Sequence, residues 1–549
     1  MTSDLIADGL AALRRGDAVA ARAAYAEALS AQQASGTGVN GEVLEGLASA
    51  SFVLQEYPRA IEEMEQAYAA YRAASDGSSA ARVARTLGGM HGSTSGDWAV
   101  ASGWIARAKT LLAEHPEGAE LGWVALTEGM FAPVRQDKHR AFHTALEVGR
   151  RTHDLELTFA TLAYLGASLV HDDQVEEGMA LLDEALAAVI GGEVDTFVVI
   201  EEIFCQLFSA CEYARDVDRA DQWIRVGEQV AERRRLPAVS AYCHTHYGGI
   251  LTAAGRWPEA DAALTDAVRL WTQSRRTLRA GALVRLADLR VRQGRYEEAE
   301  RLLDGLVDDE ATCPRAALHL ARGEDALALD LLEHAVQKAD RGSSSCVPLL
   351  ALLVDAQLAC GEDPHGTVAN LDACAEAHPS VYASAIAAHA RGRAGPGDPK
   401  PWLRAAIDGF TEAQLPFEAS VCRLDLARAC SDTNREVAVA HARSALQVFE
   451  TLQATHQADA ASALLRQLGQ KVAAPRRSGQ TLSVREAEVL RLLGEGLTNP
   501  EISQRLYISR KTVEHHVGNI LVKLGLRNRA EAAAYAVRES VGPQERTRQ

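Results

Sequence analysis

The chain has 549 residues, too many for one hydrophobic core, because single cores stop growing at roughly 250 to 300 residues. Hydrophobic residues make up 47 % and charged residues 24 %, which excludes an intrinsically disordered chain. The net charge of −17 is unevenly divided: residues 1–470 carry −23 and residues 471–549 carry +6, so we expect the C-terminal part to attract nucleic acid and the acidic body to repel it.

The N-terminal sequence predicts neither a secreted nor a membrane protein. MTSDLIADGLAALRRGD lacks the basic leader and sustained apolar stretch of a signal peptide, and no apolar run in the chain reaches about 18 residues. We therefore expect a cytoplasmic protein without a membrane segment. The nine cysteines lie between Cys205 and Cys430 without a C-x-x-C pair, so we interpret them as reduced core residues.

Residues 1–470 contain a recurring pattern of a turn residue, four further residues and then a small residue on a predicted helix. The mean period is about 38 residues, and a second small residue often follows seven positions later, two turns along the same helical face. A small side chain lets a neighbouring helix approach closely, so each unit is predicted to be a pair of antiparallel helices stacked on the next pair. The small residues are Ala21, Ala60, Ala101, Ala141, Gly178, Ala220, Ala260, Ala299 and Ala328, with companions Ala28, Ala67, Ala108, Ala185, Gly227, Ala267 and Ala335.

This pattern resembles the tetratricopeptide repeat family, although its period exceeds the 34 residues of that family. The resemblance implies an all-α fold in which residues 1–470 form an α-solenoid. Such arrays usually present a concave surface to a ligand or a protein, and we expect that use here. A spacer or a dimerisation platform is the alternative.

Residues 471–480 read as a linker, because Pro475 and Gly479 interrupt any helix. Three Ser/Thr/Asn-x-x-Glu capping boxes follow, beginning at Ser483, Thr498 and Asn528. With Ser509 as a fourth N-cap, they predict helices over about 484–494, 499–506, 510–523 and 529–539. The second and third of these are separated by a turn of the helix-turn-helix kind, and residues 541–549 form a tail.

One C-terminal segment resembles the LuxR-type DNA-binding domain along its whole length. Its sequence is LSVREAEVLRLLGEGLTNPEISQRLYISRKTVEHHVGNILVKLGLRNRAEAAAYA. The resemblance covers about 58 residues and implies a four-helix domain over residues 481–540, belonging to a bacterial transcription regulator. Such a regulator binds double-stranded DNA, pairs as a homodimer on it and contacts RNA polymerase, which places it in the cytoplasm with the nucleoid.

The third helix separates into an apolar side and a polar side at 100° per residue. Val513, Val517, Ile520, Leu521 and Leu524 are predicted to face the core. The opposite side, which would enter the major groove, carries Lys511, His515, Gly518, Asn519 and Val522, with Glu514 at its flank. Near the helix start, Ser509, Arg510, Lys511 and Thr512 offer donors and positive charge to phosphates, and Thr498 is a further expected DNA contact.

By resemblance, Glu514, His515 and Gly518 occupy the positions that touch base edges, but family members often carry a basic residue at the first and third of these. Base readout is therefore expected to depend on His515, Asn519 and Lys511, for each of which a phosphate contact or a solvated side chain is the alternative. The same resemblance assigns phosphate contacts to Lys523, Arg527 and Arg529, and pairing of two domains to Ala533 and Val537 of the fourth helix.

We predict no enzyme, cofactor or metal. None of the seven lysines follows a glycine, so the G-x-x-x-x-G-K-[ST] phosphate loop of the large ATPase members is excluded. Cys243, His244 and His246 are too close in sequence to share a helix face, which argues against a metal site. The acidic residues at 172–177 are interpreted as solvated and not as catalytic. The predicted function is a DNA-binding regulator whose array senses an unidentified ligand or protein. The alternatives are a scaffold with non-specific nucleic-acid attachment and an enzyme hidden in the array.

Overall fold

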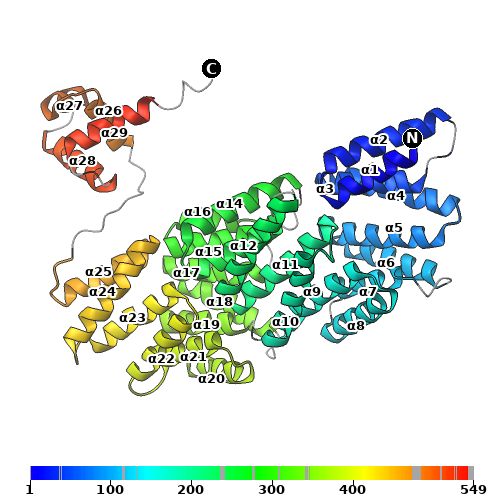
Figure 1. Ribbon diagram of the computed structural model, residues 1–549. Coiled ribbons are helices and arrows are strands. Elements are labelled where there is room, and N and C mark those ends of the chain that lie inside the picture. The colour runs from blue at the N-terminus through cyan, green and yellow to red at the C-terminus, as the bar shows by residue number, and fades with distance from the viewer. Residues whose placement is uncertain are drawn as a thin grey trace. The chain divides into compact units, whose positions relative to one another are not determined.

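A computed structural model shows the chain as helices joined by turns, with no strand among the described residues (Figure 1). The all-α prediction is therefore confirmed. The described residues are 2–35, 38, 40–113, 118–132, 134–234, 241–274, 279–306, 309–339, 344, 346–472, 484–506, 510–524, 526 and 528–541. They divide between two compact units, Met1–Leu464 and Leu465–Gln549. Within these ranges, no helix is both long and apolar enough to span a bilayer.

The first unit is an array of helical hairpins, each made of two helices that are consecutive in the sequence (Figure 1). Its helices are α1 (Thr2–Arg14), α2 (Ala18–Ser35), α3 (Gly41–Val53), α4 (Tyr57–Ala73), α5 (Gly77–Met90), the π-helix η1 (His91–Ser95), α6 (Trp98–Leu112), α7 (Glu120–Phe131), α8 (Arg135–Thr152), α9 (Leu155–His171), α10 (Val175–Gly191), α11 (Phe197–Ala214), α12 (Val217–Arg234), α13 (Ala241–Ala253), α14 (Trp257–Ser274), α15 (Arg279–Gln293), α16 (Tyr296–Leu303), the 3-10 helix η2 (Asp309–Ala311), α17 (Thr312–Arg322), α18 (Asp325–Lys338), α19 (Cys346–Cys360), α20 (His365–Ala377), α21 (Val381–Ala394), α22 (Lys400–Glu412), α23 (Pro416–Cys430), α24 (Arg435–Leu452) and α25 (Thr455–Gln467), which reaches into the second unit.

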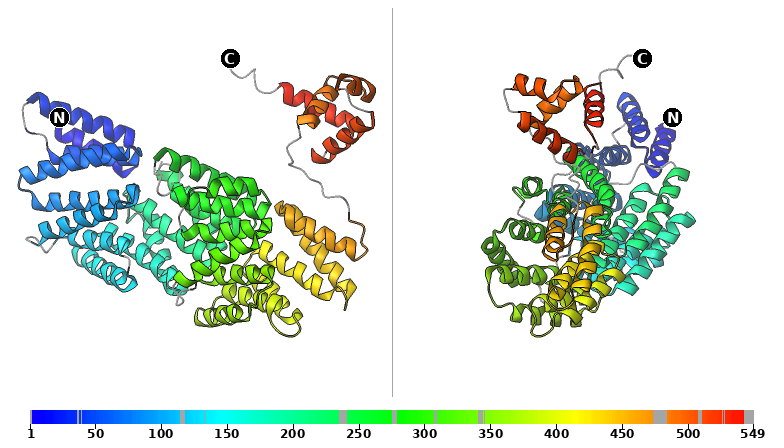
Figure 2. Two further views of the ribbon diagram at one scale, coloured as in Figure 1. Left: turned by 180° about the vertical axis from the view of Figure 1, so that it is seen from behind. Right: turned by 90° about the vertical axis from the view of Figure 1, so that its left-hand side faces the viewer.

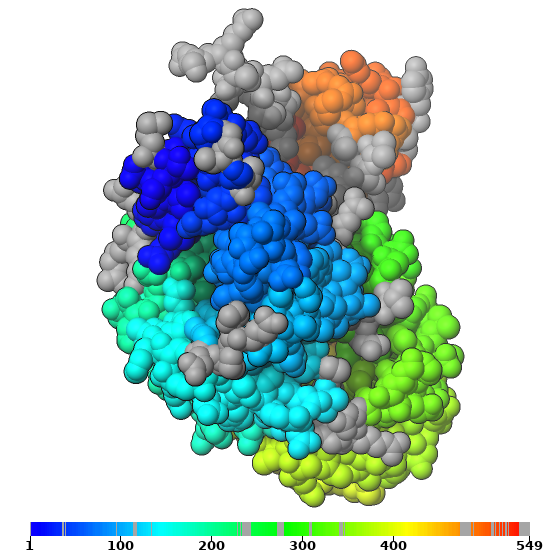
Figure 3. Space-filling view, turned by 90° about the vertical axis from the view of Figure 1, so that its right-hand side faces the viewer, coloured from blue at the N-terminus to red at the C-terminus, as the bar shows by residue number. Residues whose placement is uncertain are grey.

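The small residues of the repeat pattern lie at the contact between the two helices of a hairpin. Eight of the nine occupy the fourth position of the second helix, as Ala21 does in α2, and all eight are buried. At Gly178 the approach is so close that a Cβ atom would lie 2.4 Å from the carbonyl oxygen of Gly166 on the partner helix. The small residues therefore recur in the sequence once in each of these hairpins, at the point where its two helices touch. Figure 3 shows the first hairpins, coloured blue to cyan, stacked on one another.

Ala141 was wrongly assigned to this pattern. It is half-buried, whereas the next residue, Phe142, is 2 % exposed and fills the contact between α7 and α8. The facing helix compensates for the bulk of Phe142 with Gly129, where a Cβ atom would come within 2.4 Å of the phenylalanine ring. At this contact the large residue is on the second helix and the small residue is on the first, the reverse of the predicted pattern. A search for small residues on the second helix does not detect this arrangement.

The cysteine prediction needs one correction. All nine cysteines are free thiols, and seven are buried, but Cys313 is half-buried and Cys360 is exposed at the end of α19. The helix-like surroundings of Cys360 in the sequence did not reveal which side of its helix it occupies.

The array turns back on itself, so that its later helices contact its middle ones. Both views of Figure 2 show the yellow helices beside the green ones. The Arg292 guanidinium on α15 donates a 2.7 Å hydrogen bond to the Glu418 carboxylate on α23, and the rings of Trp257 and Phe417 lie 5.5 Å apart. The Thr455 hydroxyl also donates to the carbonyl oxygen of Gln293, at 3.0 Å. Residues more than 120 positions apart in sequence thus form one continuous body.

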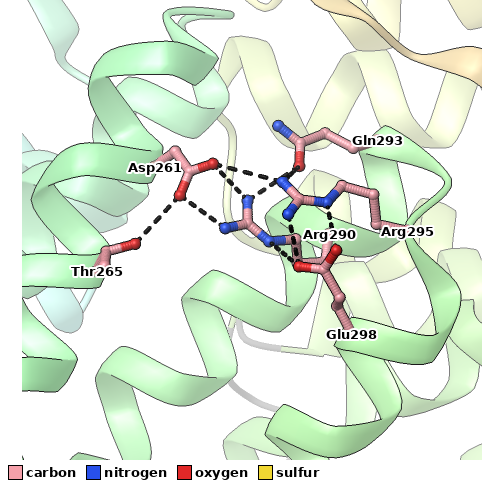
Figure 4. A network of polar contacts seen from close by, with 6 residues as sticks. All are labelled: Asp261, Thr265, Arg290, Gln293, Arg295 and Glu298. Atoms are coloured by element: carbon pink, nitrogen blue, oxygen red, sulfur yellow. Dashed lines mark hydrogen bonds and ion pairs between the residues drawn. The ribbon is translucent and has the colours of Figure 1, made fainter. Parts of the chain in front are cut away.

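An ion pair between a buried arginine and a half-buried aspartate joins two consecutive hairpins in the middle of the array (Figure 4). Arg290 on α15, 6 % exposed, donates from both Nη atoms to the Asp261 carboxylate on α14, at 2.8 and 2.7 Å. Glu298 on α16 lies 3.3 Å from the Nε atom of Arg290 and also binds Arg295. The Gln293 side-chain oxygen also accepts from Nη1 of Arg290 at 3.0 Å, so two carboxylates and an amide oxygen surround the guanidinium.

Replacing Gly294 with alanine is expected to destabilise the array more than the same change at Gly323. Both glycines adopt left-handed backbone conformations, with φ of +77° and +74°, which costs alanine about 1–2 kcal/mol. A Cβ atom at Gly294 would also lie 2.5 Å from the Thr455 hydroxyl, whereas Gly323 has open space there. Chemical denaturation of the full chain, followed by circular dichroism, compares the two. Equal shifts of the midpoint would show that the contact with α25 adds nothing.

Candidate DNA-binding interface

The second unit contains four helices around one small core. They are α26 (Val484–Gly494), α27 (Asn499–Leu506), α28 (Arg510–Lys523) and α29 (Arg529–Val541), close to the four predicted ranges. The core gathers one or more apolar residues from each helix, including Val489, Ile502, Val513, Ile520 and Ala532, all fully buried. Such a core fixes α28 against the other helices, so its remaining side is held out from the fold.

Local signals in the sequence set the helix ends. Gly496 follows α26 with φ of +84°, and the Leu497 N–H donates to the Leu492 carbonyl at 3.2 Å, which closes the helix in the manner of a Schellman motif. At the start of α27, the Glu501 carboxylate accepts from the backbone N–H and from the hydroxyl of Thr498, both at 2.6 Å. The bonds from Thr498 lower the pKa of Glu501. The Thr498 hydroxyl, predicted as a DNA contact, is exposed and already donates within the domain.

Arg529, a predicted phosphate contact, holds α29 against the turn between α26 and α27. Its Nη1 atom donates to the Asn499 side-chain oxygen at 2.5 Å, and its Nη2 atom donates to the Leu497 carbonyl. The preceding residue, Asn528, caps α29 by accepting from the Glu531 N–H at 3.0 Å, as its capping box predicts. Sequence reasoning missed the link to Asn499, because the two residues are 30 positions apart and nothing in either local sequence pairs them.

The apolar side of α28 packs against the core as the periodicity predicts. Val513 and Ile520 are fully buried, and Val517, Leu521 and Leu524 pack against the same core. On the other side, Arg510, Glu514 and Gly518 are exposed at intervals of four residues, and Thr512 is half-buried at the first turn. Four-residue spacing places these three side by side along the helix. We call Arg510, Glu514 and Gly518 the α28 face.

Several predicted contacts cannot be placed beside this face. Ser509 and Arg527 lie outside the described residues, as does the predicted cap at Ser483. The backbone of α28 carries Lys511, His515, Asn519 and Lys523, and that of α29 carries Val537, but their side chains are likewise outside the described part. Ala533, predicted for pairing, is half-buried on α29.

Gly518→Ala is expected to stabilise α28 locally by about 1 kcal/mol, because glycine is a poor helix former and a Cβ atom would meet nothing within 4 Å. Gly496→Ala is the matched control, and its left-handed backbone predicts a loss of about 1–2 kcal/mol. Hydrogen exchange of α28 peptides in the full chain should slow in the first variant and accelerate in the second. Faster exchange in Gly518→Ala would mean that this position is not a regular, open helix site.

Comparisons with known proteins match both parts of the chain. Residues 480–536 match the family described as "Bacterial regulatory proteins, luxR family", and residues 251–323 match "Tetratricopeptide repeat". The chain is similar to two Bacillus subtilis proteins: to "Transcriptional regulatory protein LnrK" with 53 % identity over 60 residues, and to "Transcriptional regulatory protein LiaR" with 49 % over 59. Each alignment covers 11 % of this chain, and 27 % and 28 % of those proteins, so the chain spans about a quarter of the length of the curated relatives it matches.

A solved structure, "Crystal structure of APC/C hetero-tetramer Cut9-Hcn1", contains a chain that aligns with 85 % of this one and 96 % of its own length, at 13 % identity and a TM-score of 0.31. The family matches coincide with the two kinds of architecture seen here, since residues 480–536 contain the core around α28 and residues 251–323 contain hairpins of the array. The C-terminal helices therefore form a LuxR-family helix-turn-helix domain, which this chain joins to tetratricopeptide repeats.

Proposed function

We propose that the chain is a sequence-specific transcriptional regulator that binds double-stranded DNA through α28. The observation that carries the proposal is the α28 face, held outward by a buried core in a domain of a DNA-binding family. A helix about 10 Å across fits the major groove, and in this proposal Arg510 at the exposed start of α28 meets a phosphate beside it. The positive balance of residues 471–549 favours the same partner.

The proposal extends to assembly and to control. Two copies would pair on DNA through α29, with Ala533 and Val537 at the contact, and would meet RNA polymerase at the promoter in the bacterial cytoplasm. The tetratricopeptide array would sense a ligand or a partner protein and control access of the domain to DNA. For this control the ligand or partner must bind more tightly to one of two states of the array, the state with the DNA-binding domain accessible or the state with it blocked.

A second candidate function is a scaffold that attaches non-specifically to nucleic acid. Gly518 favours it, because glycine has no side chain to read a base, whereas the exposed Glu514 carboxylate repels phosphate and opposes non-specific attachment. A carboxylate also accepts hydrogen bonds from the N4 atom of cytosine, so a base contact is the competing role for Glu514, and the variants at Arg510 and Glu514 described in the Discussion test it.

Selection of genomic fragments by the full chain, followed by sequencing, tests the two candidates. A regulator that pairs about a two-fold axis should recover fragments that share a palindromic site. Recovery of unrelated fragments in proportion to their abundance would instead support the scaffold and overturn the regulator.

A further inference from the structure

A cavity of about 1460 Å³ lies in the first unit, where the array turns back on itself. One wall consists of the end of α9 and parts of α10 to α15, and the other of parts of α19, α21 and α22. Ligand sites for drug-sized molecules occupy about 300–1,000 Å³, so this cavity can admit an elongated molecule.

Direct contacts between the two walls frame the cavity. The Nδ1 atom of His378 lies 2.8 Å from the Asp173 carboxylate, and the Gln414 amide donates to Asp218 at 2.9 Å. These bonds join residues about 200 positions apart in sequence. They hold the walls at a defined separation, so the cavity is part of the folded array.

The lining is strongly acidic. Among the described residues, eight carboxylates line the cavity and two guanidiniums accompany them: Asp173, Glu176, Glu177, Glu212, Asp216, Asp218, Glu310 and Glu412, with Arg215 and Arg285. A surplus of this size between two protein walls focuses a negative potential and raises the local concentration of cations, although the cavity is partly open to solvent.

Both guanidiniums already have partners in the wall. Arg285 donates to the two oxygens of Glu212 at 2.7 and 2.8 Å, and His246 lies 2.6 Å from the same carboxylate. Burial alone would raise the pKa of Glu212, but Arg285 and His246 hold this pKa below its ordinary value. Arg215 lies over the ring of Tyr382, 5.3 Å from its centre. Glu310 lies 3.3 Å from Arg285, Asp216 pairs with Arg219 at 2.9 Å, and Asp173 has His378 as its partner. The described cations of the wall are therefore committed to only some of the carboxylates that line the cavity.

Three of those carboxylates, Glu176, Glu177 and Glu412, form no ion pair with any residue in the described ranges, and all three are exposed. Glu176 and Glu177 begin α10 on one wall, and Glu412 ends α22 on the other. A carboxylate in the last turn of a helix opposes the helix dipole, so Glu412 is locally unfavourable where it stands. A positive charge beside it would remove that penalty.

We propose that this cavity binds an oligocation, a ligand with at least two alkylammonium groups that reach the carboxylates of both walls. Tyr213 and Trp271 also line the cavity, and aromatic rings attract alkylammonium groups. The inference deepens the proposed function, and rests on it for the role of sensing, because it assigns the chemistry of the sensed ligand. Binding in the cavity itself is measured without DNA.

Calorimetric titration of the full chain with spermine, and separately with tetralysine, tests the proposal. The cavity variant is Glu176→Gln with Glu177→Gln. Its matched control is Glu62→Gln with Glu65→Gln, which removes the same charge from an exposed face of α4 that does not line the cavity. The expected result is saturable binding that weakens at least tenfold in the cavity variant and less than twofold in the control.

The two probes distinguish a free polyamine from a lysine-rich peptide, and saturable, cavity-dependent binding of either supports the proposal. Equal weakening in the two variants would show attraction to the acidic surface in general, and would overturn it. Absence of saturable binding by both probes would overturn it as well. A failure here leaves DNA recognition by α28 intact, because the genomic fragment selection tests that separately.

Discussion

Arg510→Gln is expected to weaken binding of the full chain to duplex DNA by about tenfold, while Glu514→Gln strengthens it. Both residues are exposed on the α28 face, one helical turn apart, and both changes leave an amide of similar size. Removal of a phosphate-contacting cation weakens binding to all sequences and reduces the slope of log K against log salt by about 1. Fluorescence anisotropy at several salt concentrations measures both effects.

The opposite signs are the diagnostic feature of this pair. A face turned away from DNA would give two variants with unchanged affinity and unchanged salt dependence. Weakening by both variants would show that Glu514 contacts a base and that its repulsion of phosphate is secondary. That outcome would still place the α28 face on DNA, whereas unchanged affinity in both would remove it from the interface.

Asp261→Ala is expected to destabilise the repeat array by about 3 kcal/mol, because it leaves the buried Arg290 guanidinium without its bidentate partner. The 3.3 Å ion pair with Glu298 and the 3.0 Å hydrogen bond to the Gln293 side-chain oxygen remain, so the expected loss lies at the lower end of the range for a broken buried ion pair. Thermal unfolding of the full chain, followed by circular dichroism, measures the change.

Asp266→Ala is the matched control, one and a half turns further along α14. Asp266 pairs with Arg269 at 3.2 Å, but both side chains are more than half exposed, so its removal should cost less than about 1 kcal/mol. If the two variants unfolded together, the network in Figure 4 would contribute no more than a surface ion pair.

The helices of the second unit were predictable almost to the residue, because residues at or next to each helix end determine where the helix begins and stops. Asn528 caps α29 and Gly496 ends α26, and each acts on backbone groups within a few positions. The hairpins of the array were predictable for a related reason, since a small residue such as Ala21 recurs wherever two neighbouring helices touch. The error at Ala141 arose where Phe142 and Gly129 exchange the large and small roles across the contact.

The return of the array on itself could not be predicted, and neither could the cavity that it encloses. The bond between Gln414 and Asp218 joins positions 196 residues apart, and neither residue belongs to a motif. Such contacts depend on the accumulated curvature of many hairpins, in which small angles at each interface add up. The link from Arg529 to Asn499 is a shorter case of the same kind, set by the packing of α29 on the domain core.

The ratio of two affinities tests most directly whether α28 recognises sequence. The full chain is titrated against the site recovered from genomic fragments and against a duplex of the same length and composition with its order scrambled, at one physiological salt concentration. We predict binding to the recovered site at least about a thousandfold tighter, the lower range for specific DNA-binding proteins. Equal affinity for the two duplexes would contradict sequence recognition by this helix.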